Sequence, residues 1–177
     1  MQPGELIGSD RGARVSLGAD LPRAWEVLSR VMDPEVPVVS VVELGIVRDV
    51  DWHAGHLRVV VTPTYSGCPA TEVIEDDIRS ALESAGFAAP QLLRKLTPAW
   101  TTDWISASGR QRLQAYGIAP PAHSTSKRSL LGEAPEVLCP QCGSAHTELL
   151  SQFGSTACKA LYRCCECREP FDYFKCI

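Results

Sequence analysis

The run Thr62-Pro63-Thr64-Tyr65-Ser66-Gly67-Cys68-Pro69-Ala70 joins two segments with different periodicities. The segment before it, residues 57–62, is apolar and β-branched, which is typical of a buried strand. The segment after it, residues 73–85, has an apolar face at helical spacing, made of Ile74, Ile78, Ala81, Leu82 and Ala85. A strand that turns directly into an amphipathic helix predicts an α/β fold.

The sequence on both sides of this run extends the fold to a small mixed sheet with helices. A second strand-like stretch precedes the first, and His53-Ala54-Gly55-His56 between them is typical of a hairpin loop. Gly86 and Gly117 follow helical spacing and are expected to end helices. The predicted elements are helices over residues 21–32, 73–85 and 104–116, and strands over residues 41–52, 57–62 and 87–96, within a domain of residues 21–117.

The two ends of the chain and one internal stretch lack such periodicity. Residues 1–20 are Gly-rich, and we expect a flexible N-terminal arm. Residues 118–136 contain three prolines among Ser, Thr and Gly, which is a linker composition. The last 41 residues, 137–177, are too few to form much core unaided. We therefore expect a metal to hold this separate C-terminal module together.

Composition limits the classes of protein to which the chain can belong. The 177 residues carry a formal net charge of −4, which does not favour a polyanion-binding protein. No apolar stretch approaches the roughly 18 residues that a membrane span needs, and the first residues lack a secretory signal pattern. We expect a cytoplasmic protein with no membrane or nucleic-acid partner. Thiols stay reduced there, so the eight cysteines favour metal binding over disulfides.

Four cysteines form two Cys-x-x-Cys pairs, Cys139 with Cys142 and Cys164 with Cys167. Each pair is expected in a tight turn, and together they supply the four thiolates of a closed, structural Zn²⁺ site. The 21 residues between the pairs slightly exceed the usual spacing of about 15 to 20. The pattern predicts a zinc ribbon with strands over residues 147–153 and 159–163.

Other interpretations of the cysteine-rich tail stay open. The four thiols could form disulfides, or bind iron or an iron–sulfur cluster instead of zinc. Cys165 could replace Cys164 as a ligand, whereas Cys158 and Cys176 are not needed for a four-sulfur site. Cys158 and Cys176 are then either small buried apolar residues, or they bind a second metal or take part in sulfur transfer. The aromatic residues expected to pack against the two turns are Phe171, Tyr173 and Phe174.

The eighth cysteine, Cys68, stands alone before the helix of residues 73–85. Pro69 suits the first helical position, which places Cys68 at or next to the N-cap. The helix dipole favours an anion there, so we expect a lowered pKa and a thiolate that binds a metal or persulfide, or acts as a nucleophile. The alternative is a buried capping cysteine without chemistry. Asp33 and Glu35 are expected to cap a turn or, alternatively, to share a metal with Cys68.

Three motifs carry a family resemblance: Asp33-Pro34-Glu35-Val36-Pro37, then Val42-Glu43-Leu44-Gly45-Ile46-Val47, then Thr62 followed by Gly67-Cys68-Pro69. In this order they resemble the metal–sulfur cluster assembly family of iron–sulfur biogenesis, over about residues 20–110. The resemblance implies an α/β sandwich in which Cys68 and Asp33 form an iron- or cluster-transfer site. A homodimer or a partner's ligand would complete it. The implied cargo is a transient iron ion or iron–sulfur cluster, and no residue is assigned a catalytic role.

The tail narrows this resemblance. The runs Phe153-Gly154-Ser155-Thr156-Ala157-Cys158-Lys159-Ala160-Leu161-Tyr162-Arg163-Cys164 and Arg168-Glu169-Pro170-Phe171-Asp172-Tyr173-Phe174-Lys175 are similar to those of phenylacetate-degradation members that carry a zinc ribbon. This similarity implies a maturation factor for the multicomponent phenylacetyl-CoA epoxidase, not its catalyst. The [2Fe–2S] reductase of that system would be the first client and its di-iron subunit the second.

Two rival functions stay open on the sequence. The chain could be a structural or electron-transfer component of the oxygenase, which would require a redox cluster in the tail. It could also be a nucleic-acid-binding zinc ribbon. Residues 139–177 hold four basic and four acidic residues, however, and such a balance does not favour phosphate binding.

Overall fold

The computed structural model describes residues 20–65, 67–121 and 136–175. The predicted N-terminal arm up to residue 19, residues 122–135 of the predicted linker, and Cys176 lie outside these ranges. Within them, every helix is too short or too polar to cross a membrane.

The first sheet has three strands in the order β1-β2-β3. Strands β1 (Val47–His53) and β2 (His56–Val61) are antiparallel, and β3 (Gln91–Arg94) lies parallel to β2. The predicted hairpin is confirmed, since His53 pairs with His56. Its two loop residues, Ala54 and Gly55, have φ values of 48° and 83°, as the favoured two-residue hairpin turns require.

The first predicted strand begins too early, because residues 41–45 form turns instead. These turns bury Val41 and Leu44 without placing them in the sheet. Gly45 has a φ of 68°, and a Cβ atom there would lie 2.6 Å from the carbonyl oxygen of Trp104. The close approach of two backbone segments therefore bends the chain before β1.

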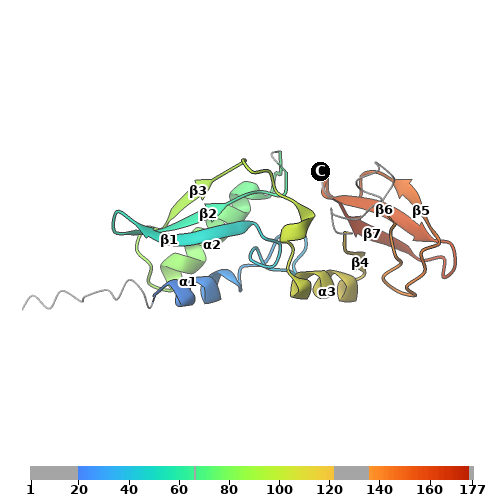
Figure 1. Cartoon of the computed structure of the whole chain (residues 1–177), viewed down its shortest axis with the longest axis horizontal. Helices are drawn as coiled ribbons and strands as arrows, with labels where there is room; N and C mark the ends of the chain where they lie inside the picture. The colour runs from blue at the N-terminus through green and yellow to red at the C-terminus, as the bar shows by residue number, and fades with distance from the viewer. Residues whose placement is uncertain (1–19, 66, 122–135, 176–177) are drawn as a thin grey trace, which may run out of the picture.

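Helices α1 (Asp20–Leu28) and α2 (Thr71–Ser84) contact each other, and α1 contacts β1 (Figure 1). The predicted apolar face of α2 is buried at Ile74, Ile78 and Leu82. Beyond its C-terminus, Gly86 has a φ of 91° and the amide of Phe87 donates to the Leu82 carbonyl at 3.0 Å. This 6→1 bond through a left-handed glycine ends the helix as predicted.

A short 3₁₀ helix, η1 (Thr102–Trp104), leads into α3 (Ala107–Tyr116). The hydroxyl of Ser106 accepts from the amide of Gly109 at 3.0 Å, which caps the first turn of α3. Gly117, with a φ of 93°, ends the helix. In Figure 1, α3 lies between the first sheet and a second one.

The second sheet has four strands in the order β4-β7-β6-β5. Its central strands are β6 (Lys159–Cys164) and β7 (Pro170–Phe174), and β5 (Thr147–Ser151) forms one edge. The other edge is β4 (Ile118–Ala119), which pairs in parallel with β7. The predicted linker therefore overlaps the second sheet at its first two residues, a pairing too short to be visible in composition.

Two apolar clusters fill the structure. A smaller one includes Cys139, Cys164, Phe171 and Tyr173, so these two aromatic side chains pack against the cysteine turns as predicted. Phe174 does not. It lies with residues of α1, α2 and the first sheet in the larger cluster, which also includes Cys158. Two side chains of the tail, Phe174 and Cys158, therefore pack into the apolar core of the N-terminal domain.

Candidate metal centres

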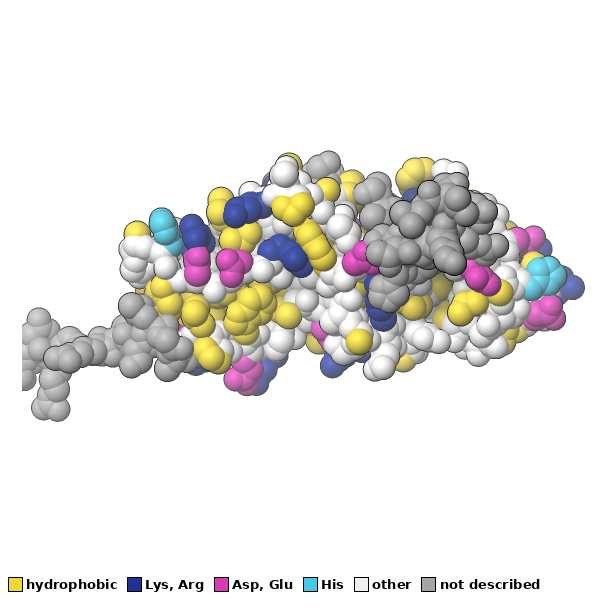
Figure 2. All heavy atoms as spheres, in the orientation of Figure 1, with side chains coloured by type: hydrophobic (Ala, Val, Ile, Leu, Met, Phe, Trp, Pro, Cys, Tyr) yellow, Lys and Arg dark blue, Asp and Glu magenta, His cyan; other side chains and the backbone are white. Residues whose placement is uncertain are grey.

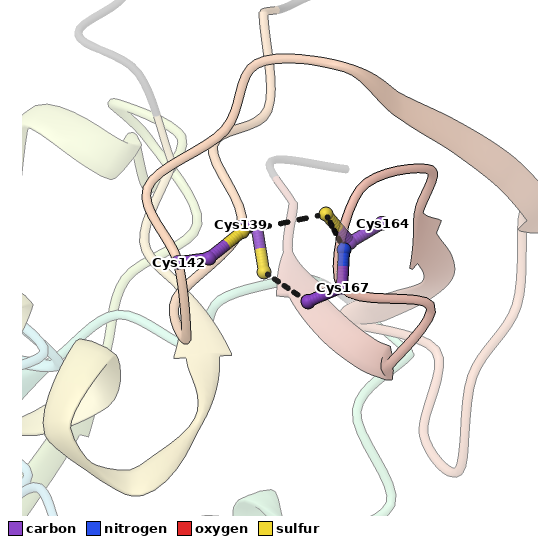
Figure 3. Close-up of side chains that lie close together, drawn as sticks. All are labelled: Cys139, Cys142, Cys164 and Cys167. Carbon is purple, nitrogen blue, oxygen red and sulfur yellow. Dashed lines mark hydrogen bonds between the residues drawn. The ribbon is translucent and has the colours of Figure 1, made fainter.

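The four cysteines of the Cys-x-x-Cys pairs come together in the second sheet (Figure 3). One pair lies in the turn before β5 and the other at the turn between β6 and β7. Their four sulfur atoms all lie within 4.8 Å of one another. The Sγ atoms of Cys139 and Cys167 are 3.7 Å apart, and those of Cys142 and Cys164 are 3.5 Å apart.

These separations fit a tetrahedral metal. A tetrahedron with metal–sulfur bonds of about 2.3 Å has sulfur–sulfur edges of about 3.8 Å. The amide of Cys167 donates to the Sγ of Cys164 at 3.5 Å, and this bond is the largest of several that lower the pKa of the Cys164 thiol to about 6. A metal ligand must be deprotonated, so these bonds favour Cys164 as a ligand. Four sulfur donors leave no open position, which is the arrangement of a structural site.

Two neighbouring side chains, Cys165 and His146, lie outside the four-sulfur group. Cys165, which could have replaced Cys164, is not part of the group, and its amide instead donates to the His146 carbonyl at 2.8 Å. The exposed imidazole of His146 pairs with Glu166, Nδ1 to Oε1, at 3.1 Å. The cysteines of the described residues are free thiols, so the disulfide interpretation is wrong for this structure.

A second site surrounds Cys68, which lies half-buried in the turn before α2. The helix begins at Thr71 with Ala70 as its N-cap, so Cys68 precedes the cap by two residues. The thiol lines a cavity of about 20 Å³ beside Asp33 and Glu35. The two segments that carry the predicted transfer residues, Cys68 and Asp33, therefore meet at one cavity.

Asp33 also has a structural role at this cavity. Its Oδ1 accepts hydrogen bonds from the amides of Glu35 and Val36, each at 2.9 Å, so the capping interpretation is correct. The side chain is 8% exposed, and burial raises the pKa of its carboxyl group. Asp33 thus fixes the backbone that presents Glu35 to the cavity.

The expected lowering of the Cys68 pKa is wrong. Burial raises the pKa of this thiol above 9.0, and the charges of Glu35 and Asp33 add to the effect. The Ala70 amide and the Thr71 side chain oppose it without overcoming it. Burial and nearby carboxylates outweigh the helix terminus, so Cys68 is a thiol at neutral pH and a metal must displace its proton.

Cys158 is the residue of this site that the sequence did not place. It belongs to the tail, yet it lines the same cavity as Cys68. Its Sγ lies 3.7 Å from Oε2 of Glu35 and 3.1 Å from Oγ1 of Thr156. Burial raises the pKa of Cys158 to about 11. The only signal in the sequence was a thiol that the four-sulfur site did not need.

Charge on the described surface is mixed. Figure 2 shows basic and acidic side chains interspersed along the face that it presents. In the tail, Arg163 pairs with Glu148, and Lys159 Nζ lies 3.7 Å from Asp172 Oδ2. Two of the four basic side chains of the tail are thus paired with acids, which weakens the case for a phosphate-binding face.

Comparisons with known proteins match the two regions of the chain that carry these sites. Residues 23–86 match the family described as "Iron-sulfur cluster assembly protein", and residues 123–175 match "PaaD zinc beta ribbon domain". The crystal structure of a "Domain of Unknown Function DUF59 from Bacillus anthracis" superposes with a TM-score of 0.52 at 26% identity. It covers 55% of this chain and 94% of that one.

Two relatives extend the likeness. A "Fe-S protein maturation auxiliary factor" of Porphyromonas gingivalis is 37% identical over 82 residues, which is 45% of this chain and 77% of that protein. An Escherichia coli protein named as a component of a "Putative 1,2-phenylacetyl-CoA epoxidase" is 54% identical over 153 residues, 86% of this chain and 91% of its own length. Identity of this extent across both matched regions places the chain in the PaaD family, which carries an iron–sulfur cluster assembly domain and a zinc β-ribbon.

Proposed function

We propose that this protein is a cytoplasmic maturation factor for a phenylacetyl-CoA epoxidase system, and that it delivers iron or an iron–sulfur cluster through Cys68. The observation that carries the proposal is the shared cavity of Cys68 and Asp33, within a domain of the iron–sulfur assembly family. The names of the Escherichia coli and Porphyromonas gingivalis relatives supply the two halves of the assignment, the oxygenase system and the maturation role.

The accessibility of the Cys68 thiol supports transient binding. A sealed thiol could not exchange a metal, and a fully exposed one would hold it without protection, whereas Cys68 is half-buried. Its raised pKa means that a proton competes with the metal at neutral pH. Weak, reversible binding of this kind suits a carrier better than a storage site.

The four-sulfur site has a different role in the proposal. We assign Zn²⁺ to Cys139, Cys142, Cys164 and Cys167, because four converging thiols with no open position suit a structural zinc. Zinc would keep the ribbon folded, so that it can contact the client. In the domain organisation that we propose, residues 21–117 carry the cargo and residues 137–177 contact the client.

The test compares clients matured with wild-type protein and with Cys68→Ser. The variant should keep its fold and its zinc but yield a [2Fe–2S] reductase deficient in iron. The reductase is the first client to assay and the di-iron subunit the second. Iron and acid-labile sulfide are measured on the purified clients. Normal loading of both clients by Cys68→Ser would refute the carrier role.

A second function, a resident component of the oxygenase, is favoured by one observation. The Escherichia coli relative is named as an epoxidase component, and four thiolates also suit iron. This function requires a stable redox centre at the four-sulfur site. Metal analysis and EPR spectroscopy of anaerobically purified protein separate the two, since about one zinc and no iron at that site would exclude electron transfer through it.

A further inference from the structure

The cavity at Cys68 contains a second thiol that comes from the other sheet. Cys68 precedes α2 on one wall, and Cys158 precedes β6 on the other. Glu35 and Asp33, from the segment between α1 and β1, also line it. Two thiols and three carboxylates, including that of Glu75 on α2, thus line the cavity where the N-terminal domain contacts the ribbon.

Backbone contacts fix Cys158 in this position. The carbonyl of Cys158 accepts from the amide of Lys175 at 2.9 Å, at the end of β7. The preceding loop is held by a bond of 2.8 Å from the Gly154 amide to the Lys159 carbonyl. A Cβ at Gly154 would lie 3.0 Å from Asp172 Oδ1, so this loop packs closely on β7. The thiol is therefore held at the cavity by the ribbon, not by a mobile segment.

The surroundings of Cys158 are not those of a space-filling apolar side chain. Its Sγ lies 3.7 Å from Oε2 of Glu35, and the charges of Glu35 and Asp33 raise the pKa of Cys158 after burial itself. The same two carboxylates raise the pKa of Cys68. Thiolates and carboxylates that share a buried cavity repel one another. Ionisation of the two thiols is therefore unfavourable unless a cation lies among these groups.

Two basic side chains near the cavity form ion pairs with acidic side chains other than Glu35 and Asp33. Arg94 binds Glu75, which also lines the cavity, with Nε 2.7 Å from Oε1. Lys159, whose charge lowers the pKa of Asp33 and of Cys158, has its Nζ 3.7 Å from Asp172 Oδ2. Glu35 and Asp33 belong to neither of these pairs. The two thiols and the carboxylates of Glu35 and Asp33 are therefore the available donors. This mixture of sulfur and oxygen suits a divalent transition metal such as Fe²⁺.

The size of the cavity is compatible with a single ion. A volume of about 20 Å³ accommodates roughly one water-sized sphere, so one metal ion fits without enlarging the cavity. We propose that Cys68, Cys158 and Glu35 bind a single Fe²⁺ ion between the two sheets, with Asp33 as the residue that positions Glu35. This inference rests on the proposed function, because the ion is its cargo.

The donor atoms approach further when the ion binds. Among the residues that the structure describes, only the four ribbon cysteines place three or more ligand atoms within 4.8 Å of one another. Glu35 already contacts Cys158, and Cys68 and Glu35 are both half-buried and therefore not enclosed by packing. The site is therefore open in this structure and closes around its cargo.

Binding and release balance without a change of oxidation state. Each thiol gives up one proton as its sulfur binds Fe²⁺, so two protons leave for each ion, and the Glu35 carboxylate binds without releasing one. On transfer to a client the two sulfurs recover their protons.

The test is an anaerobic titration of the full-length, zinc-loaded protein with Fe²⁺ against a chromogenic chelator, with proton release followed in weak buffer. Wild-type protein should bind one ion beyond its zinc and release two protons. Cys68→Ser and Cys158→Ser should each lower the affinity by at least about tenfold and release one proton. Cys165→Ser is the matched control, since it removes a thiol outside the cavity, and it should titrate as wild type.

The outcomes separate this inference from the proposed function. Wild-type affinity and two released protons in Cys158→Ser would overturn the inference, while loss of binding in Cys68→Ser alone would leave the carrier role intact. Acid-labile sulfide equal to the bound iron would also overturn it, because the cargo would be a cluster. Absence of iron binding in the wild type, with normal client loading by Cys68→Ser, would refute the proposed function itself. If Cys158→Ser loses zinc or unfolds, Glu35→Gln decides, and unchanged affinity there rejects the site.

Discussion

The indole ring of Trp100 meets the ring of Phe174 edge-on, with centroids 6.1 Å apart and planes inclined by 62°. Nε1 of Trp100 donates to the Leu44 carbonyl at 2.9 Å, which fixes the indole to the N-terminal domain. Phe174 ends β7 of the ribbon and is 1% exposed. The last strand of the ribbon thus places an aromatic ring in the core of the other domain, where Phe174 lines the same cavity as Cys158 and Cys68.

Phe174→Ala should therefore destabilise the whole protein. Loss of a fully buried aromatic ring costs about 3 to 5 kcal/mol of unfolding free energy. Chemical denaturation followed by tryptophan fluorescence measures it, because Trp100 lies against the deleted ring. Phe153→Ala is the control, since Phe153 is 66% exposed on the same ribbon, and it should change stability by less than about 0.5 kcal/mol. Equal effects of the two substitutions would mean that the interdomain contact contributes nothing.

Elements with strong local periodicity could be predicted from the sequence. The apolar spacing of α2 and the loop of the β1–β2 hairpin are local patterns, and both are confirmed. The start of β1 could not be predicted, because residues 41–46 are apolar for a different reason. They bury Val41 and Leu44 in turns that pack under Trp104 and Trp100, and composition does not distinguish such turns from a strand.

The two candidate metal centres also differ in how far local sequence predicts them. The four ribbon cysteines are paired by short spacing, so their convergence could be predicted from the sequence. The cavity joins Cys158 to Glu35 across 123 residues, and no local pattern reports such a contact. The pKa of Cys68 was predicted in the wrong direction because burial, which depends on packing from distant segments, outweighs its place near the start of α2.

Cys142→Ser should abolish metal binding at the ribbon. Cys142 is exposed, so the substitution removes a ligand without disturbing the packed core. The zinc content measured by metal analysis should fall from about one ion per chain to almost none, because structural zinc sites need all four ligands. Tyr162, which contacts Phe171 and Tyr173 beside the site, should lose its near-ultraviolet circular dichroism as the ribbon unfolds.

The control for this loss is Cys165→Ser, which lies between two of the ligands but outside the cluster. It should retain zinc and the aromatic signal. A ribbon that stays folded without metal in Cys142→Ser would contradict the structural assignment. Equal zinc loss in both variants would mean that the ligand set has been assigned wrongly.

The rate of Cys68 alkylation should be low at neutral pH and should reach its maximum only at high pH. The raised pKa keeps the protonated, unreactive thiol dominant at pH 7, so the thiolate fraction and the rate should still be rising steeply with pH at pH 9. Glu35→Gln removes a charge that raises this pKa and should move the rate profile to lower pH. The rate of iodoacetamide labelling at Cys68, measured by mass spectrometry of the peptide, reports both. A wild-type midpoint below pH 8 would show that the helix terminus prevails after all.

Substitutions at Asp33 separate its two contributions. Asp33→Ala removes the acceptor of two amide bonds and should cost about 1 to 3 kcal/mol of stability. Because those bonds position Glu35, it should also weaken Fe²⁺ binding by about 10- to 100-fold, as loss of a residue that orients a ligand does. Asp33→Asn keeps an oxygen acceptor and removes a buried charge, so it should recover the lost stability and most of the affinity. Chemical denaturation and the chelator competition measure the two. If Asn binds iron as weakly as Ala while matching wild-type stability, the carboxylate itself is a ligand, and its role extends beyond positioning Glu35.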